Sequence, residues 1–351
     1  MRYRAACYGY FSKGIRAAHK ALILTIQQKR TMVMQSDELV RGLLYLFLVV
    51  LGIPGNALVI WAFLQTLYSE HQLLPADAIV LHLVSVNLLV VAVRCLFEAL
   101  ATFRLVNVFT DAGCKSVITV YRTARSLSIW LTFVLSAYQC LSIAPPGSHW
   151  AEARSAAARY LGVIFFTLWL ANTLISSPSA IFSTGWRNSS SLLEHSINVQ
   201  FCFVRFPDGV SRDVNGAVQV VRDVVPMALM TTTSLIILIF LYRHSQQVKN
   251  LRSNSSQGVS GERRAAKSVV TLVTMYVLFY GVDNGLWVYT LTVQQTMSSS
   301  LVSDLRIFFS SLYAAISPFV IIASNKKVNR HLICMVQEKA TQKVDTTLSS
   351  V

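Results

Sequence analysis

The chain has 351 residues, of which 54% are hydrophobic and only 13% are charged. Soluble domains contain about 25% charged residues, so this composition argues against an ordinary soluble enzyme. The 18 Phe, 13 Tyr and 6 Trp exclude a disordered chain. An integral membrane protein remains. The net charge of +15 suits basic cytoplasmic loops that touch anionic lipid, and no basic run with interleaved aromatics indicates nucleic-acid binding.

Seven long apolar segments follow one another along the chain. Each exceeds the roughly 20 residues that a helix needs to cross about 30 Å of hydrocarbon. Strands would be shorter and would alternate with a period of two. The sequence therefore predicts an all-α membrane protein with a seven-transmembrane helix bundle between an N-terminal segment, 1–38, and a tail, 325–351. The predicted spans are 39–65, 78–101, 114–143, 158–182, 217–242, 265–293 and 302–324.

The basic residues between the spans predict the orientation in the membrane. The connection between the fifth and sixth spans and the tail are rich in Lys and Arg, whereas the loop 183–216 balances three arginines with three acids. This distribution predicts an outer N-terminus and a cytoplasmic C-terminus. Residues 1–31 disagree, with seven basic residues and no acid. We interpret them as an upstream extension that is not made or as a targeting segment, with a genuine basic tail as the alternative.

Two cysteines and one sequon lie on the predicted outer side. Cys114 opens the third span, and Cys202 lies in the long outer loop. Because both face the oxidising compartment, we expect a disulfide that holds this loop over the bundle; two unpaired thiols are the alternative. The sequon at Asn188 in the same loop is a candidate glycosylation site, whereas the sequon at Asn254 would lie in the cytoplasm and stay unmodified.

The sequence carries no signature of catalysis. The motifs H-E-x-x-H and G-x-S-x-G and the P-loop are absent. The predicted seventh span contains no lysine that would form a retinal Schiff base. We therefore expect no enzyme, no cofactor and no metal site.

The span motifs depart from the common rhodopsin-like receptor pattern in a consistent way. The inner end of the third span reads A-Y-Q-C instead of D-R-Y, Asn87 stands where an Asp is usual, and the seventh span contains S-P-F-V instead of N-P-x-x-Y. With R-S-L-S-I at 125–129 and L-S-A-Y-Q at 135–139, the third span resembles that of vomeronasal type 1 receptors. The seventh span and L-H-L at 81–83 also resemble theirs. Within that family, the sequence most resembles the fish olfactory receptors class A related.

This resemblance implies a chemosensory G-protein-coupled receptor, a multi-pass protein of the plasma membrane. Its partners would be a small pheromone- or odorant-like molecule and a heterotrimeric G protein of the inhibitory type. Bitter taste receptors are the runner-up, although their span motifs fit less well. A seven-span ligand-gated channel of the insect odorant type is a third possibility. The basic residues 1–31 favour the cytoplasmic N-terminus of such a channel, whereas the loop charges and the cysteine pair oppose it.

Ionisable residues inside spans are costly and usually face the bundle or a water-filled cavity. Here they gather in the outer halves of the spans, with pairs at helical spacings of three and four that share one face. The candidate ligand-binding residues are Arg94, Glu98, Tyr121, Arg122, Arg125, Asp283 and Trp287. Further charges lie at Arg222 and Asp223 in the fifth span and at Asp304 and Arg306 at the start of the seventh.

Two roles compete for the arginines of the third span. A guanidinium group matches carboxylate or sulfate in a bidentate manner, so Arg122 or Arg125 could bind an anionic group of the ligand. Alternatively, Arg125 pairs with Glu98 or Asp283 and holds spans together, and a ligand acid could then compete with Asp283 and loosen the sixth span. Tyr121 replaces the acid that binds amines in similar receptors, which argues mildly against an amine bound in the familiar way. Asp283 or Glu98 could still bind one.

The predicted inner ends of the spans carry the candidate contacts to the G protein. Tyr138 and Gln139 occupy the place of D-R-Y, and we expect them to form hydrogen bonds there. The basic residues of the sixth span are either G-protein contacts or a simple positive-inside anchor. They are Arg263, Arg264 and Lys267. After the seventh span, 326–336 predicts a short amphipathic helix, in which Cys334 is a palmitoylation candidate.

Overall fold

The computed structural model describes residues 39–102, 110–143, 149–185, 196–198, 202–250, 257–292, 300–325 and 327–330. Seven helices within these ranges are long and apolar enough to cross a membrane. The predicted all-α bundle of seven membrane-spanning helices is therefore confirmed, whereas its orientation stays a prediction. The interpretations of residues 1–31, Asn188 and Cys334 lie outside the described residues.

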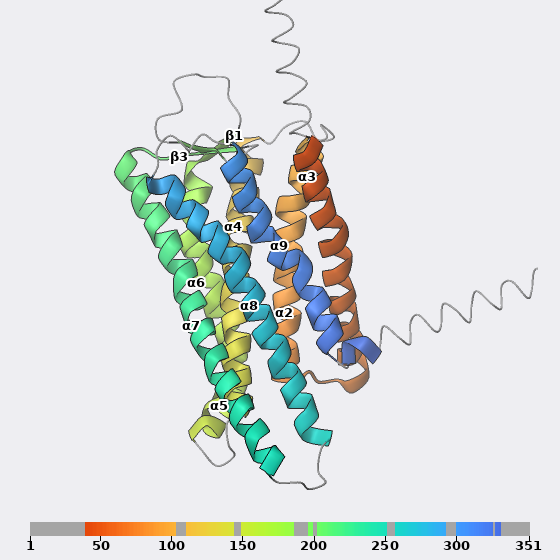
Figure 1. The fold of residues 1–351 in the computed structure, drawn as a ribbon. Coiled ribbons are helices and arrows are strands. Elements are labelled where there is room, and N and C mark those ends of the chain that lie inside the picture. Colours follow the sequence, from red (N-terminus) through yellow and green to blue (C-terminus); the bar gives the residue numbers. More distant parts are fainter. Residues whose placement is uncertain are drawn as a thin grey trace, which may run out of the picture.

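The seven long helices run side by side (Figure 1). The first is Leu39–Glu70. The second span is continuous but changes type, from α2 (Pro75–Val90) through the π-helical turn η1 (Val91–Leu96) to α3 (Phe97–Thr102). Pro75 begins α2, where its missing N–H costs nothing. The other helices are α4 (Asp111–Ile143), the short α5 (His149–Arg159), α6 (Leu161–Phe182), α7 (Gly209–Asn250), α8 (Gln257–Thr292) and α9 (Ser300–Ser324).

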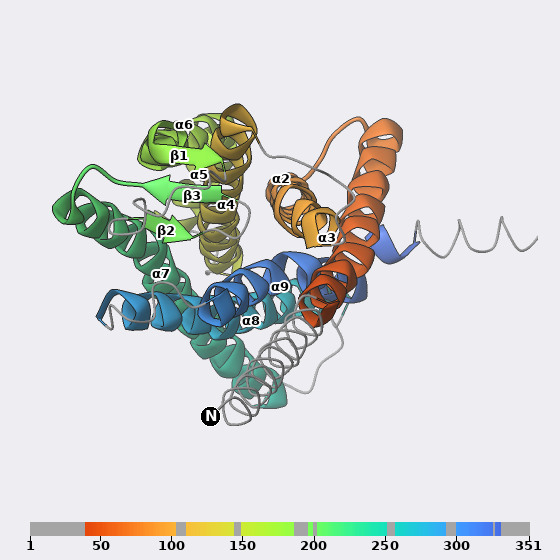
Figure 2. The same ribbon diagram turned by 90° about the horizontal axis from the view of Figure 1, so that it is seen from above.

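Three short strands cover one end of the bundle beside α4 and α6 (Figure 2). They are β1 (Ser183–Gly185), β2 (Ser196–Asn198) and β3 (Cys202–Arg205), paired antiparallel in the order β1-β3-β2. The predicted disulfide is present: Cys202 of β3 is bonded to Cys114 near the start of α4, with the two Cα atoms 5.8 Å apart. We call this end of the bundle the disulfide end. The opposite end, with α5, Asn325 and residues 327–330, is the tail end.

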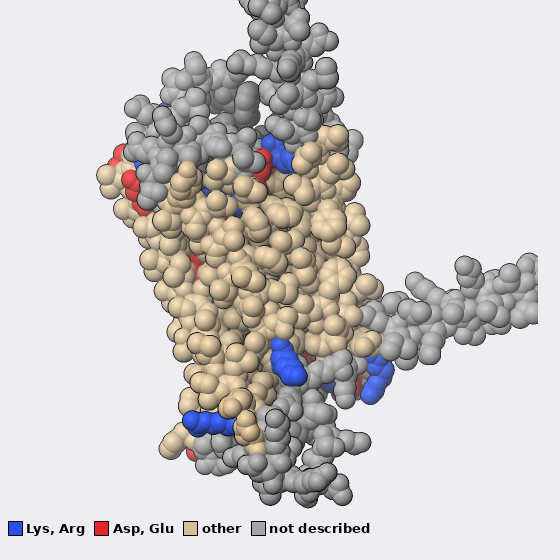
Figure 3. Space-filling view, in the orientation of Figure 1, with Lys and Arg blue, Asp and Glu red and all other residues tan. Residues whose placement is uncertain are grey.

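One face of the bundle is largely apolar between the two ends. Most of the described face in Figure 3 lacks Lys, Arg, Asp and Glu, which gather toward the ends. Large apolar side chains are exposed on the outside of α6, including Val163, Phe166 and Leu174. A helix that exposes such side chains is stable in lipid, where the backbone hydrogen bonds are satisfied within the helix.

The first helix approaches α9 closely because glycine lines the contact. A Cβ atom at Gly52 would lie 3.1 Å from the Cα of Ala315, and one at Gly55 would lie 2.9 Å from the Cγ of Pro318. Small residues allow such close backbone contacts between membrane helices. Asn56 fixes the same contact, since its Nδ2 donates a hydrogen bond of 2.9 Å to the carbonyl oxygen of Ala314.

A buried polar lock joins α2, α4 and α9 near the middle of the bundle. The Nδ2 of Asn87 donates to the Oγ of Ser317 at 2.9 Å, and the Oγ of Ser128 donates to the Oδ1 of Asn87 at 2.6 Å. All three side chains are fully buried. An amide can fill both roles because it carries a donor and an acceptor, whereas an ionised aspartate could only accept.

We expect Asn87→Ala to destabilise the protein by about 1–3 kcal/mol, because it leaves two buried serine hydroxyls without their partner. Thermal denaturation of the purified protein in detergent measures this loss. Ser85→Ala is the matched control, since Ser85 is exposed on the same helix and bonds only to the carbonyl oxygen of Leu81 among the described residues. Equal melting temperatures for the two variants would show that the lock does not contribute to stability.

Candidate ligand-binding site

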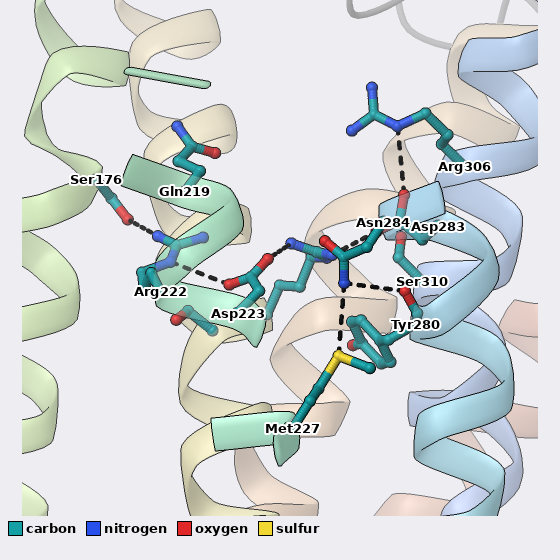
Figure 4. A network of polar contacts seen from close by, with 12 residues as sticks. Ser176, Gln219, Arg222, Asp223, Met227, Tyr280, Asp283, Asn284, Arg306 and Ser310 are labelled. Atoms are coloured by element: carbon teal, nitrogen blue, oxygen red, sulfur yellow. Dashed lines mark hydrogen bonds and ion pairs between the residues drawn. The ribbon is translucent and has the colours of Figure 1, made fainter. Parts of the chain in front are cut away.

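Charged side chains from four helices meet in the half of the bundle nearer the disulfide end (Figure 4). Those of α4 follow Cys114 by 8 and 11 residues, which places them about 12 and 16 Å along the helix. We call the set the arginine cluster. Its members are Arg122 and Arg125 of α4, Arg222 and Asp223 of α7, Asp283 of α8 and Arg306 of α9.

Arg125 joins α4 to both α7 and α8. Its Nη1 donates to the Oδ2 of Asp223 at 2.5 Å, and its Nη2 donates to the Oδ2 of Asp283. The two aspartate side chains are only 3% and 4% exposed, so these ion pairs are buried. The guanidinium carbon also lies 5.0 Å from the ring centroid of Tyr280. Of the two partners expected for Arg125, Asp283 forms the ion pair and Glu98 does not. The second partner of Arg125 is Asp223.

Each aspartate of the cluster is shared with a second arginine. The Nε of Arg222 donates to the Oδ1 of Asp223 at 3.1 Å, and the Nε of Arg306 lies 3.4 Å from the Oδ1 of Asp283. In Figure 4, Arg222 and Asp223 of α7 face Asp283 and Arg306 across the bundle. Both carboxylates are therefore engaged by the chain itself.

Arg122 differs from the other members because no carboxylate of the described residues forms an ion pair with it. Its Nη1 donates to the Oγ of Ser179 on α6 at 2.7 Å. The cluster thus holds four arginines against two aspartates, an excess of two positive charges.

A separate ion pair lies beside the cluster on the second span. Arg94 of η1 and Glu98 of α3 are 3.4 Å apart, with side chains 1% and 3% exposed. The guanidinium carbon of Arg94 lies 5.6 Å from the ring centroid of Tyr121, whose hydroxyl is 2.8 Å from the Oγ of Ser310. Arg94 and Glu98 balance each other's charge, so this pair adds nothing to the positive excess.

The seven predicted ligand-binding residues therefore divide into three groups. Arg122, Arg125 and Asp283 belong to the arginine cluster. Arg94, Glu98 and Tyr121 form the neighbouring group. Trp287 lies in α8, but its side chain is outside the described part of the structure. Tyr289, two residues further along α8, is 49% exposed.

Sequence reasoning did not assign Arg222, Asp223 or Arg306 to the site, although all three stood out as charges within spans. The adjacent Arg-Asp pair in an apolar segment was the available signal. It was not decisive, because the sequence does not fix the rotation of one helix relative to another. The two serines of α6, Ser176 and Ser179, gave no signal at all.

Comparison with known proteins tests the resemblance directly. The model of the vomeronasal organ pheromone receptor family matches residues 41–334, which include all seven spans except the first two residues of the first. The chain belongs to this family.

Individual receptors of this family are also similar to the chain in sequence. The chain is 38% identical over 312 residues to olfactory receptor class A-like protein 1 of Danio rerio, covering 89% of this chain and 97% of that protein. It is 30% identical over 287 residues to vomeronasal type-1 receptor 2 of Homo sapiens, covering 81% and 72%. The protein is thus a chemosensory G-protein-coupled receptor and a multi-pass protein of the plasma membrane. The relatives are receptors and not enzymes.

At the tail end, the receptor places its predicted G-protein contacts on two helices. Tyr138 and Gln139 are half-buried on α4, and the carbonyl oxygen of Tyr138 accepts a hydrogen bond from Ser142 at 2.9 Å. Lys267 is exposed on α8. The side chains of Arg263 and Arg264 lie outside the described part of the structure.

An unpredicted ion cluster ties the segment after α9 to the first connection. The Nζ of Lys327 lies 2.9 Å from Glu70 and 3.4 Å from the Oδ2 of Asp77. Partial burial lowers the pKa of Lys327, but the attraction of the two carboxylates outweighs it, so the pKa lies above its ordinary value. Lys327 therefore stays charged at physiological pH, with a carboxylate of the first helix and one of α2 as its counter-ions.

Proposed function

We propose that the receptor detects a small organic anion, whose acidic group binds in the arginine cluster. The observation that carries this proposal is the excess of four arginines over two aspartates inside a membrane-spanning bundle. Uncompensated charge in such a place is costly, and a bound anion would reduce it. An amine would instead add to the positive charge, so electrostatic complementarity selects against it.

The disulfide end is the outer end in this proposal, and the N-terminus lies outside. Two observations support this orientation. The Cys114–Cys202 disulfide suits an oxidising compartment. The basic residues between α7 and α8 and in the tail suit the cytoplasm. A ligand that arrives from outside would then meet the arginine cluster in the outer half of the bundle.

Activation requires two states of the bundle with different affinities for the ligand. Arg125 of α4 is bonded to α7 through Asp223 and to α8 through Asp283. A ligand acid that binds near Arg122 competes with Asp283 for the arginines, and the tie between α4 and α8 weakens. The tail end of α8, around Lys267, then moves and opens the surface that a G protein binds.

The Arg122→Gln variant tests the ligand site. We expect the half-maximal concentration of an activating aromatic carboxylate such as benzoate to rise about 10- to 100-fold, because a charge-assisted hydrogen bond is lost. The assay is a calcium dose response in cells that express a promiscuous G protein, with benzyl alcohol and benzylamine as matched probes. Arg159→Gln, at an exposed position of α5, is the control for expression. Activation by the amine or alcohol alone would overturn the proposal.

We further propose coupling to an inhibitory-type G protein, as family resemblance implies. A toxin that ADP-ribosylates inhibitory-type α subunits should abolish the response when no promiscuous G protein is supplied. A response of full size after toxin treatment would assign the receptor to another class of G protein.

A further inference from the structure

We propose that Arg122 and Arg222, with Ser176 and Ser179 of α6, form a subsite for a doubly charged oxyanion. This inference rests on the proposed function, in which an anionic ligand binds near Arg122. It adds that Arg222 and the two serines also contact the acidic group, and that this group carries two negative charges. Arg125 is in this view a positioning residue, because both of its terminal nitrogens are already bonded to aspartates.

The two serines hold the two arginines side by side. Ser176 and Ser179 are three residues apart, so they share one face of α6 with Cβ atoms about 5–6 Å apart. Both side chains are fully buried. Ser179 accepts a hydrogen bond from Arg122 at 2.7 Å, and Ser176 accepts one from Arg222 at 3.2 Å. Two guanidinium groups of the same charge are thus bonded to neighbouring serines on one face of α6.

Several donors of this subsite have no acceptor in the described part of the chain. The Nη2 of Arg222 is buried without a hydrogen-bond partner, although the side chain is only 2% exposed. In Figure 4, Arg222 is joined by dashed lines to Ser176 and Asp223 only. The hydroxyls of Ser176 and Ser179 accept from the arginines but donate to none of the described residues. Buried donors are rarely left without an acceptor, so in this proposal the ligand supplies the acceptor that the described residues do not.

The charge of the cluster indicates what that partner is. Within the six described residues of the cluster, Asp223 and Asp283 balance two of the four arginines, which leaves two positive charges in this set. A singly charged anion would leave one of these two charges unbalanced, and a water molecule would leave both unbalanced. An oxyanion with two negative charges balances the cluster and offers several oxygen atoms to the donors of Arg122, Arg222 and the two serines. A phosphonate or phosphate monoester has this chemistry.

The test compares probes of equal shape and different charge. Phenylphosphonate is doubly charged at mildly alkaline pH, benzenesulfonate is singly charged and equally tetrahedral, and benzoate is singly charged and planar. In the calcium assay at that pH, the wild-type receptor should respond to phenylphosphonate at a concentration about tenfold lower than to benzenesulfonate, the effect of one additional charge-assisted interaction. Arg222→Gln should reduce this preference to near equality.

Two further variants keep the test valid if Arg222→Gln does not reach the cell surface. Ser176→Ala combined with Ser179→Ala removes the hydroxyls without changing any charge and should weaken the response to phenylphosphonate about tenfold. Ser177→Ala is the matched control, since Ser177 lies on the exposed side of α6, and it should respond as the wild type does.

The outcomes separate the two proposals. If the wild type responds to benzoate or benzenesulfonate but does not prefer phenylphosphonate, the subsite is overturned and the anionic ligand stands. The same holds if Arg222→Gln at the cell surface keeps the full preference, or if the double serine variant matches Ser177→Ala. If the wild type responds to benzylamine and to none of the anions, the proposed function fails and the subsite fails with it.

Discussion

The Asp283→Asn variant is expected to lose about 3–5 kcal/mol of folding free energy, the usual cost of removing one partner from a buried ion pair. Asp283 is bonded to Arg125, lies 3.4 Å from Arg306 and is 4% exposed. Its neutralisation leaves the four arginines of the cluster with a single aspartate. We therefore expect a strong decrease in melting temperature and in the yield of monodisperse receptor from detergent.

The Arg125→Gln variant is the matched comparison and should be much less destabilised. Both carboxylates keep a counter-ion in this variant, because Asp223 still pairs with Arg222, and Asp283 still lies beside Arg306. The positive excess of the cluster also falls from two charges to one. The double variant Asp283→Asn/Arg306→Gln should recover part of the loss, because it removes one of the uncompensated cations. Equal melting temperatures for Asp283→Asn and Arg125→Gln would contradict the charge count on which the proposed function rests.

Loss of the disulfide should have the second large effect. Cys202→Ser separates β3 from α4 and opens a link between residues 88 positions apart. Removal of a native disulfide typically costs about 2–5 kcal/mol. Because the bond also anchors the strands that cover the disulfide end, we expect less receptor at the cell surface and a lower melting temperature.

Cys140→Ser provides the control for the chemical change. Cys140 is a buried free cysteine on α4, the helix that also carries Cys114. It should be destabilised by much less than Cys202→Ser. The double variant Cys114→Ser/Cys202→Ser should be no less stable than either single variant, since the two residues make one bond. A Cys202→Ser receptor as stable as Cys140→Ser would show that the disulfide does not stabilise the fold.

The seven spans were predictable because the physical requirement is local. A helix must be apolar over its whole length to lie in lipid, so the sequence displays each span directly. The disulfide was predictable for a different reason, since Cys114 and Cys202 are the cysteines that the predicted topology brings to the same oxidising side. The short strands β1, β2 and β3 have no comparable signal, because three or four residues carry too little pattern.

The ion pairs of the site were predictable only in part. Arg94 and Glu98 pair as their spacing along one helix suggests. Glu98 is therefore unavailable to Arg125, which the sequence alone could not establish. The contact of Arg125 with Asp223 depends on how α4 and α7 are rotated toward each other, and that rotation is set by packing over the whole bundle. The hydrogen bonds of Ser176 and Ser179 to arginines could not be predicted either. Buried serines in membrane helices also occur as small packing residues, so their presence does not indicate a polar contact.

Direct binding to the purified receptor tests the central claim, that the arginine cluster binds an anion. A ligand that binds the folded state raises the melting temperature by mass action. In lipid nanodiscs, small aromatic carboxylates such as benzoate should raise the melting temperature of the wild type, whereas benzyl alcohol and benzylamine should not. Arg122→Gln should abolish the shift with benzoate. Stabilisation by benzylamine, with no shift for any carboxylate, would contradict the account.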